Sequence, residues 1–301
     1  MRDQSSNASA GVAYALGAYG IWGLTPIYWK ALADFPASEL LAHRVLWSCA
    51  TGLVLVWLLG ARASVRDALA SPRRWAPVAL TGLVIGGNWL VFLWAVLHDQ
   101  VLATSLGYYI TPLVNVLMGV LVLRERLRPL QIGAVALATL GIAQLAFELG
   151  ELPWVTLVLA LSFAFYGLVR KITPVEPVAG FALETLVLFP LGLGFLAWLG
   201  LRGEAVFPEM GAGTMILVSL SGIATAAPLI LFNAAARRLP LSTLGFFQYI
   251  APSITFVLAV TVFGEPFERV RGIAFACVWV ALVMFSLDSF RARRADPTRA
   301  N

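Results

Sequence analysis

The chain has 301 residues, of which 60% are hydrophobic and only 12% are charged. Soluble domains are about 45–50% apolar and about 25% charged, so a soluble core could not bury this much apolar surface, and the composition predicts a membrane protein. The net charge of +5 does not indicate nucleic-acid binding, because the basic residues lie in short gaps between apolar runs. Cys49 and Cys277 lie in apolar runs, which predicts neither a disulfide framework nor a metal site, and we expect no cofactor.

Ten apolar segments are each long enough to cross a bilayer, which takes about 20 mostly apolar residues. After an N-terminal tail over residues 1–10, we expect spans at residues 11–30, 39–59, 76–97, 101–123, 130–147, 153–169, 178–199, 212–235, 241–263 and 272–290, followed by a C-terminal tail over residues 291–301. The gaps are too short for a soluble domain. The sequence therefore predicts an all-α polytopic membrane protein with ten transmembrane helices.

Lysine and arginine are unequally divided between the two sides of this arrangement. Of the 21 residues of these two types, 16 lie on the side of both termini, Arg170 and Lys171 among them. The other five are Lys30, Arg44, Arg202, Arg269 and Arg271. Because loops rich in lysine and arginine stay in the cytoplasm, we expect a multi-pass protein of the cell (inner) membrane with both termini cytoplasmic.

Two stretches of the sequence repeat at an offset of 140 residues. Tyr109–Glu125 reads YITPLVNVLMGVLVLRE and Tyr249–Glu265 reads YIAPSITFVLAVTVFGE, so both begin Tyr-Ile-x-Pro and place a glutamate thirteen residues after the proline. With five spans in each half, the second copy enters the membrane from the opposite face, as in secondary transporters that bind their substrate between inverted repeats. We expect one five-helix repeat over residues 11–147 and a second over residues 153–290.

Several motifs resemble those of the drug/metabolite transporter superfamily, in its EamA-type ten-helix branch, and more narrowly those of the RarD group. They are YGIWGLTPIYWK (19–30), ELLAHRVLWS (39–48), NWLVFLWAV (88–96), SLGYYITPLVNVLMG (105–119) and GFFQYIAPSITFVLAV (245–260). The resemblance covers roughly residues 11–290 and implies an inner-membrane permease. It supplies no substrate.

Two basic side chains, His43 and Arg44, interrupt the second apolar segment, where charge is costly. Arg44 could extend back past Glu39, about 7.5 Å away along the helix, to the outer headgroups. It could instead face a central cavity and bind an anionic substrate group or a carboxylate, which suits a permanently charged, two-pronged guanidinium. His43 could bind substrate or take part in proton coupling; it could equally pack within the bundle, bonded to Glu39 one turn earlier.

Glu184 is the acidic residue that lies well inside an expected span. When Pro36 is aligned with Pro177, Glu184 corresponds to His43 in the other repeat. An ionisable group inside the membrane is a functional candidate by default, and we assign Glu184 to proton coupling. The alternative is an uncharged, hydrogen-bonded glutamate near the inner interface.

Other polar and aromatic side chains inside the spans complete the expected substrate site. They are Asn88, Gln248, Tyr108, Tyr109, Tyr249, Trp22, Trp89 and Trp94. The amides could equally join helices to one another. Pro112 and Pro252 leave the carbonyls of Tyr108 and Gln248 without a helical donor, which could expose polar backbone to a cavity or simply bend the helices. The deeper tryptophans could line a pocket that accepts an aromatic group.

These observations favour a secondary transporter for a small organic solute, amino-acid-like or otherwise, over an enzyme. No G-x-x-x-x-G-K-[ST] motif is found, so we expect a proton or solute gradient to supply the energy. A structural or partner-binding membrane protein is one alternative. An intramembrane enzyme is another, but no G-x-S-x-G setting accompanies His43 or His98. The expected partners are the solute and the lipid bilayer, and the sequence leaves a homodimer open.

Overall fold

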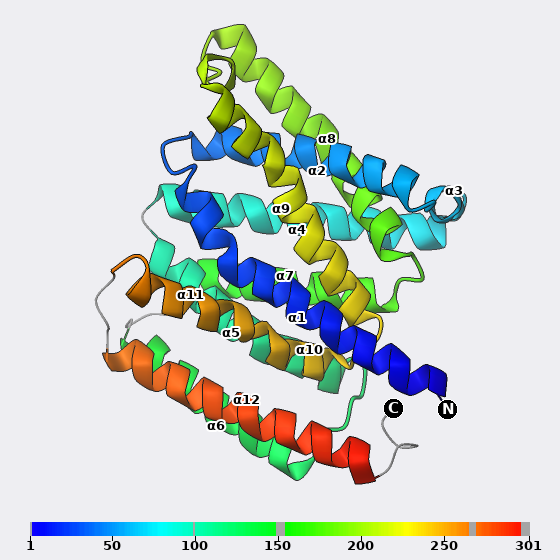
Figure 1. Cartoon of the computed structure of the whole chain (residues 1–301), viewed down its shortest axis with the longest axis vertical. Coiled ribbons are helices and arrows are strands. Elements are labelled where there is room, and N and C mark those ends of the chain that lie inside the picture. The colour runs from blue at the N-terminus through cyan, green and yellow to red at the C-terminus, as the bar shows by residue number, and fades with distance from the viewer. Residues whose placement is uncertain (1, 99, 149–153, 265–268, 296–301) are drawn as a thin grey trace.

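The computed structural model describes residues 2–98, 100–148, 154–264 and 269–295. These residues form helices and their connections, and no strand occurs among them (Figure 1). The helices are α1 (Arg2–Lys30), α2 (Ala37–Leu58), α3 (Arg62–Leu69), α4 (Pro72–Leu97), α5 (Val101–Leu121), α6 (Pro129–Glu148), α7 (Trp154–Ile172), α8 (Pro177–Arg202), the short 3-10 helix η1 (Phe207–Glu209), α9 (Ala212–Ala236), α10 (Leu241–Gln248), α11 (Ile250–Thr261) and α12 (Arg269–Ala295).

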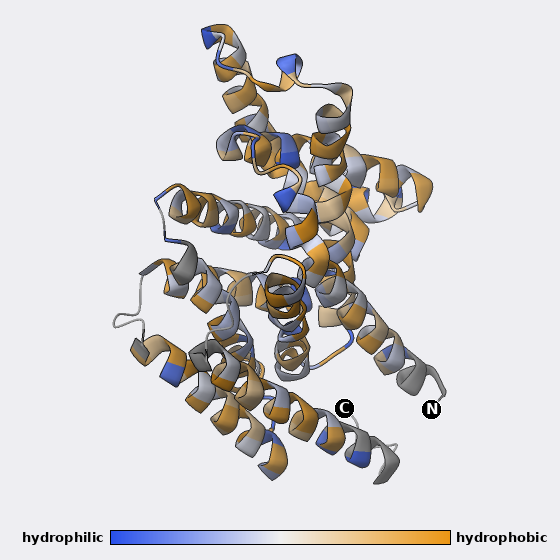
Figure 2. Cartoon of the chain, turned by 60° about the vertical axis from the view of Figure 1, so that its left-hand side comes forward, coloured by the Kyte–Doolittle hydropathy of each residue, from blue (hydrophilic) through white to orange (hydrophobic). Residues whose placement is uncertain are grey.

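The expected all-α polytopic membrane fold is confirmed. Among the described residues, eight segments are helical, long and apolar enough to span a bilayer, with α10 and α11 together forming one of them. The shorter apolar part of α12, Gly272–Asp288, and the helix α1 bring the number to the ten that the sequence predicts. Hydrophilic residues gather at the helix ends and connections, whereas apolar residues run along the helices (Figure 2).

Three details differ from the expected segments. The helix α1 begins at Arg2 rather than after a ten-residue tail, and α12 continues to Ala295. A short helix, α3, occupies the polar gap after the second span. The ninth span is broken at Tyr249, since Pro252 has no N–H to donate to the Gln248 carbonyl, while α5 runs unbroken past Pro112.

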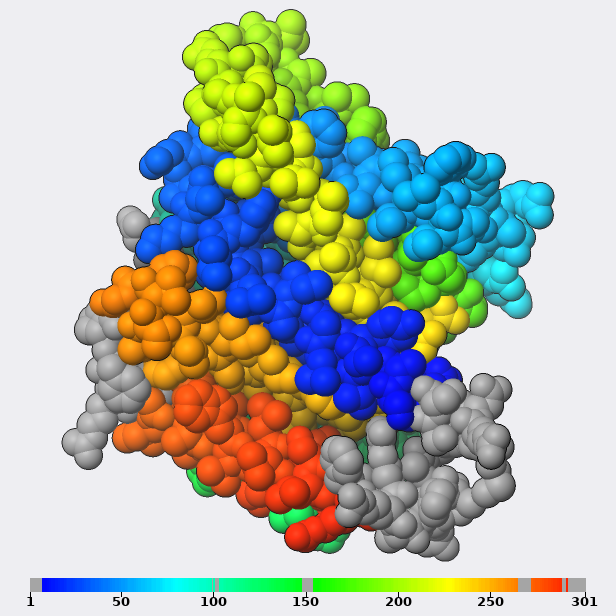
Figure 3. Space-filling view, viewed as in Figure 1, coloured from blue at the N-terminus to red at the C-terminus, as the bar shows by residue number. Residues whose placement is uncertain are grey.

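Helices of the two halves of the chain pack mainly against each other. The helix α2 packs on α8 and α9, α5 on α7 and α10, and α6 on α12. If the halves are related by a two-fold axis, α1 corresponds to α7, and α5 corresponds to α10 and α11 together. The contact of α1 with α11 then has its counterpart in the contact of α7 with α5, and both contacts are present. Figure 3 shows α1 lying across one face between α9 and α11. The exact repeat boundaries stay a prediction.

Both ends of the described chain, Arg2 and Ala295, lie on one side of the bundle, which we call the termini side (Figure 1). The helices α4 and α8 approach closely because Gly82 and Gly86 face α8. A Cβ atom at Gly82 would lie 3.0 Å from the Glu184 carbonyl oxygen, and one at Gly86 would lie 2.5 Å from the Leu188 side chain. This small-residue stripe is what lets two backbones approach in a membrane.

Candidate functional site

The Arg44 side chain points into the bundle. Its Nε donates a hydrogen bond of 2.8 Å to the Thr225 hydroxyl, midway along α9. The guanidinium carbon lies 4.1 Å from the centre of the Trp89 ring and 5.5 Å from that of Trp29. A side chain held at the middle of a neighbouring helix, between two indoles, does not extend to the headgroups. The guanidinium therefore lies inside the bundle, and the binding of an anionic group by Arg44 stays a prediction.

Arg44 has no carboxylate partner within 4.0 Å among the described residues, although it is half-buried. A guanidinium carries five N–H donors in a planar fork, and the bond to Thr225 uses one of them. Tyr28 and Tyr108 lie close enough to interact electrostatically with Arg44. The site therefore combines a fixed positive charge, free donors and four aromatic neighbours from α1, α4 and α5.

His43 lies one residue away in sequence but in different surroundings. Its Nε2 is 3.7 Å from a carboxylate oxygen of Glu39, and its ring lies 4.2 Å from that of Phe207. The buried Glu39 carboxylate accepts hydrogen bonds from the backbone N–H groups of Val206 and Phe207, each at 2.9 Å. His43 thus lies where α2 contacts the connection that follows α8. Its position next to Glu39 is the one given by the interpretation in which His43 packs within the bundle.

Glu184 is 2% exposed and belongs to a buried polar network that joins four helices. The Thr81 hydroxyl on α4 donates to it at 2.7 Å, and the Tyr166 hydroxyl on α7 donates at 3.2 Å. Asn233 on α9 donates in turn to the Tyr166 hydroxyl at 2.8 Å. The Arg170 Nε lies 3.3 Å from the Glu184 carboxylate, so the network contains a buried ion pair.

Arg170 corrects one part of the sequence interpretation. It was expected among the basic residues of a loop, but it is 1% exposed and packs inside the bundle. None of its three guanidinium nitrogens has a hydrogen-bond partner among the described residues, so Arg170 interacts with the Glu184 carboxylate by charge and not through a hydrogen bond. Local sequence could not reveal this, because Arg170 lies in the last turn of α7, where basic side chains usually reach water.

The Arg170 guanidinium fits only because Gly180 has no side chain. A Cβ atom at Gly180 would lie 2.2 Å from an Arg170 Nη. We expect Gly180→Ala to lower the free energy of unfolding by about 1–3 kcal/mol, because it overpacks a rigid site. Gly194→Ala is the matched control, since Gly194 lies in the same helix with open space around it. The measurement is the midpoint of thermal unfolding of both purified variants. Equal midpoints for Gly180→Ala and Gly194→Ala would contradict the expectation.

Four of the expected site residues make their ring or hydrogen-bond contacts with groups other than Arg44. Trp22 packs in an aromatic cluster with Phe163 and Phe232, at ring distances of 5.7 and 5.8 Å. Asn88 donates to the Leu159 carbonyl and the Ser162 hydroxyl on α7, and so joins two helices. Trp94 stacks on His98 at the end of α4. Tyr109 packs against Phe275 at 5.2 Å.

The break in the ninth span places two further candidates in the interior. Gln248 accepts a hydrogen bond of 2.7 Å from Asn115 on α5. Tyr249 is 1% exposed, and its hydroxyl has no hydrogen-bond partner among the described residues. Of the residues chosen from the sequence, the structure thus brings together Arg44, Trp89 and Tyr108, and sequence reasoning missed Tyr28, Trp29 and Thr225. The Trp-Lys end of the first motif was the available signal for Trp29.

Glu125, the glutamate of the first repeated motif, connects the two halves on the termini side. Its carboxylate accepts hydrogen bonds from the backbone N–H groups of Leu241 and Ser242, at 2.6 and 2.9 Å, and from the Ser242 hydroxyl at 2.7 Å. It thereby caps the N-terminus of α10, whose free N–H groups favour an anion. The corresponding Glu265 lies outside the described residues. The repeated Pro-to-Glu spacing was therefore the signal of a structural cap.

We expect Glu125→Gln to destabilise the chain by about 1–2 kcal/mol, because the capping oxygen loses its charge and one acceptor becomes an NH2 group. Glu204→Gln is the control, since Glu204 is exposed and pairs with an exposed Arg202. The measurement is the unfolding midpoint in detergent. A midpoint for Glu125→Gln that matches the control would mean that the cap contributes no stability.

The comparisons with known proteins agree with this structure. Residues 9–147 match the EamA-like transporter family. The chain is 45% identical to an uncharacterised transporter of Pseudomonas aeruginosa, over 97% of this chain and 98% of the relative, and 43% identical to protein RarD of Streptomyces exfoliatus, over 96% and 92%. It shares its fold with a protein of known crystal structure at 23% identity and a TM-score of 0.69, over 93% and 98% of the two chains. The chain is a multi-pass membrane transporter that belongs to the EamA-like family of the drug/metabolite transporter superfamily, in its RarD group.

Proposed function

We propose that this transporter moves a small organic solute that carries a carboxylate, amino-acid-like or otherwise, and that Arg44 holds the carboxylate. The observation that carries the proposal is a half-buried guanidinium without a carboxylate partner among the described residues. A charge at this depth is costly unless something pairs with it. A transported carboxylate can accept two parallel hydrogen bonds from the free donors of Arg44.

The aromatic walls of the site set a second requirement on the solute. Trp29 and Trp89 lie over the guanidinium, and Tyr28 and Tyr108 stand nearby. Such rings offer apolar contact area and exclude water, which strengthens the charge-assisted bonds at Arg44. A solute with a compact apolar or aromatic body attached to the carboxylate satisfies both parts of the site.

The mechanism we infer is alternating access between the two halves, coupled to protons through Glu184. Arg44 lies near the end of α2 that is away from the termini. On the termini side, the hydrogen bond from Thr81 to Glu184 and the Glu125 cap join the two halves, and the Arg170–Glu184 ion pair lies beside them within the second half. Protonation of Glu184 would leave Arg170 as an unpaired buried charge, and separation of α4 from α7 and α8 would let water reach it. His43 is the weaker coupling candidate, because Glu39 already pairs with it.

The orientation in the membrane belongs to the same proposal. The described arginines Arg62, Arg66, Arg73, Arg74, Arg126 and Arg128 all lie at helix ends or connections on the termini side. By the positive-inside rule, we infer that the chain lies in the inner membrane with both termini on the cytoplasmic side. The closed termini side is therefore the cytoplasmic side, and the Arg44 site is approached from outside.

The test compares pairs of solutes that differ only at the carboxylate. Purified protein is titrated with small amino acids and other monocarboxylates, and with the amide or ester of each, while tryptophan fluorescence reports on Trp29 and Trp89 beside Arg44. At least one carboxylate should bind while its neutral counterpart binds at least tenfold more weakly. The same solute should move in proteoliposomes, and faster with a pH gradient. Equal binding of every acid and its amide would overturn the carboxylate assignment.

A further inference from the structure

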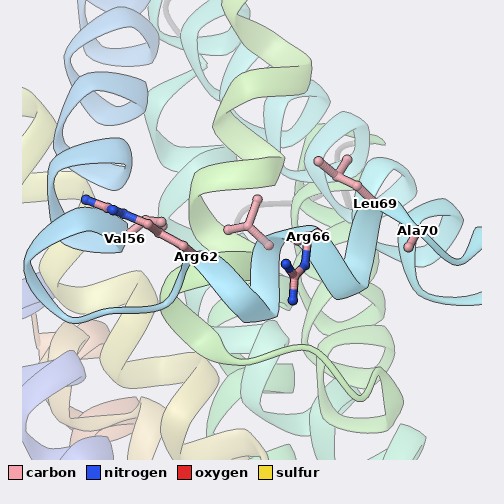
Figure 4. A pocket seen from close by; sticks show the side chains of 6 residues that line it. Val56, Arg62, Arg66, Leu69 and Ala70 are labelled. Atoms are coloured by element: carbon pink, nitrogen blue, oxygen red, sulfur yellow. The ribbon is translucent and has the colours of Figure 1, made fainter.

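Two hollows open on the surface of the termini side, and neither includes Arg44. The one with a volume of about 530 Å³ lies between the end of α2 and the short helix α3. Its lining residues are Val56, Arg62, Val65, Arg66, Leu69 and Ala70 (Figure 4). The transport site described above does not use this hollow.

The hollow has an apolar floor and a cationic rim. Val56, Val65, Leu69 and Ala70 contribute the floor, and the exposed lining surface is almost entirely apolar. Figure 4 shows the lining side chains spread along α3, with Arg62 beside Val56 of α2. An apolar floor gives no reason for a polar solute to bind, whereas a hydrocarbon chain would remove this surface from water.

The two arginines of the rim form no ion pair with any carboxylate in the part of the chain that the structure describes. Arg62 and Arg66 are one turn apart on α3, so they lie on the same face, where like charges repel. Both are exposed, and no carboxylate lies within 4.0 Å of either among the described residues. Arg73 and Arg74 follow at the start of α4. This corner therefore has an excess of positive charge that an anion would relieve.

The position of the hollow in the fold selects the kind of anion. The helix α3 links the end of one spanning helix, α2, to the start of another, α4, so the hollow lies at the surface of the bilayer. There, phospholipid headgroups carry phosphate and their acyl chains lie directly beneath. Basic pockets beside transmembrane helices on this side are suited to anionic headgroups.

We propose that the hollow between α2 and α3 binds one anionic phospholipid, with an acyl chain on the Val56–Leu69 floor and the phosphate between Arg62 and Arg66. The lipid would neutralise the rim and tie α3 to the end of α2. A zwitterionic lipid presents the same chain but carries a cationic group beside its phosphate, so it fits the floor and not the net charge of the rim.

The experiment uses the full-length chain, stripped of lipid in detergent. Dioleoylphosphatidylglycerol is titrated against dioleoylphosphatidylcholine, with native mass spectrometry to count retained lipids and the unfolding midpoint to measure stabilisation. The phosphatidylglycerol should bind more tightly and raise the midpoint. Each of Arg62→Gln and Arg66→Gln should weaken its binding about fivefold, and the double variant about 25-fold, since one arginine near such a surface contributes that much. Both residues are exposed, so folding is not expected to suffer.

Matched controls distinguish binding in this hollow from a general attraction of anionic lipid to a basic surface. Arg126→Gln/Arg291→Gln removes the same charge from exposed positions outside the hollow, and its lipid binding should stay at the wild-type level. Leu69→Ser should weaken lipid binding while leaving the response to inorganic phosphate unchanged. The proposal is overturned if phosphatidylcholine binds equally, if the control pair loses as much binding as the rim pair, or if inorganic phosphate alone stabilises the chain as well as the lipid does.

Discussion

Replacing Arg44 with alanine should abolish carboxylate binding and gradient-driven transport while leaving the chain folded. The variant removes the charge and the donors that face Trp89 and Thr225. A hydrogen bond to a charged group is worth about 1.5–3 kcal/mol, so two of them lost correspond to at least a hundredfold loss of affinity. The half-buried side chain has no ion-pair partner among the described residues, so its removal leaves no carboxylate there unpaired, and the midpoint of unfolding should change little.

The measurement is solute affinity by tryptophan fluorescence together with uptake by proteoliposomes. Arg44→Lys should retain part of the binding, because it keeps the charge but loses the two-pronged geometry. Arg202→Ala is the control, since Arg202 lies at the same side of the membrane but is exposed and pairs with Glu204. Unimpaired transport by Arg44→Ala would remove Arg44 from the mechanism.

The second large effect is expected at the buried pair of Arg170 and Glu184. Glu184→Gln leaves the Arg170 charge buried without a partner, and removal of one member of a buried pair costs about 3–5 kcal/mol. The double variant Glu184→Gln/Arg170→Met should recover most of that stability, because an apolar chain of similar length occupies the cavity without a charge. Chemical denaturation of the wild type, the single variants Glu184→Gln and Arg170→Met, and the double variant gives the coupling energy between the two positions.

Measuring transport with and without a pH gradient distinguishes a role of Glu184 in proton coupling from a purely structural role. If Glu184 couples transport to protons, the stable double variant should still bind solute but should no longer respond to a pH gradient. A double variant that is stable and keeps full gradient dependence would restrict the pair to holding the four helices together. A double variant as unstable as Glu184→Gln would contradict the ion-pair argument itself. Thr81→Val is a useful comparison, as it removes one hydrogen bond to Glu184 without stranding a charge.

Sequence alone could predict only part of the site, because residues that contact one another there are far apart along the chain. Arg44 was chosen because charge is rare in an apolar segment, but its partner Thr225 lies 181 residues away. Glu184 was chosen for the same reason, yet Arg170, its ion-pair partner, was counted among the loop residues. His43 has the same local setting as Arg44, but one step along a helix turns a side chain by about 100°, which is enough to direct it toward Glu39 and Phe207.

The sequence by itself determined the membrane environment and the number of spans. A run of about 20 apolar residues has its backbone satisfied in a bilayer only as a helix, so composition and length sufficed for the ten spans. Tertiary structure alone decided which polar groups meet, because lipid-facing and partner-facing positions are equally apolar. Among the described residues, Arg44 lies beside aromatic rings with no carboxylate partner, whereas Arg170 is buried and paired with Glu184. In both cases the neighbouring groups come from other helices.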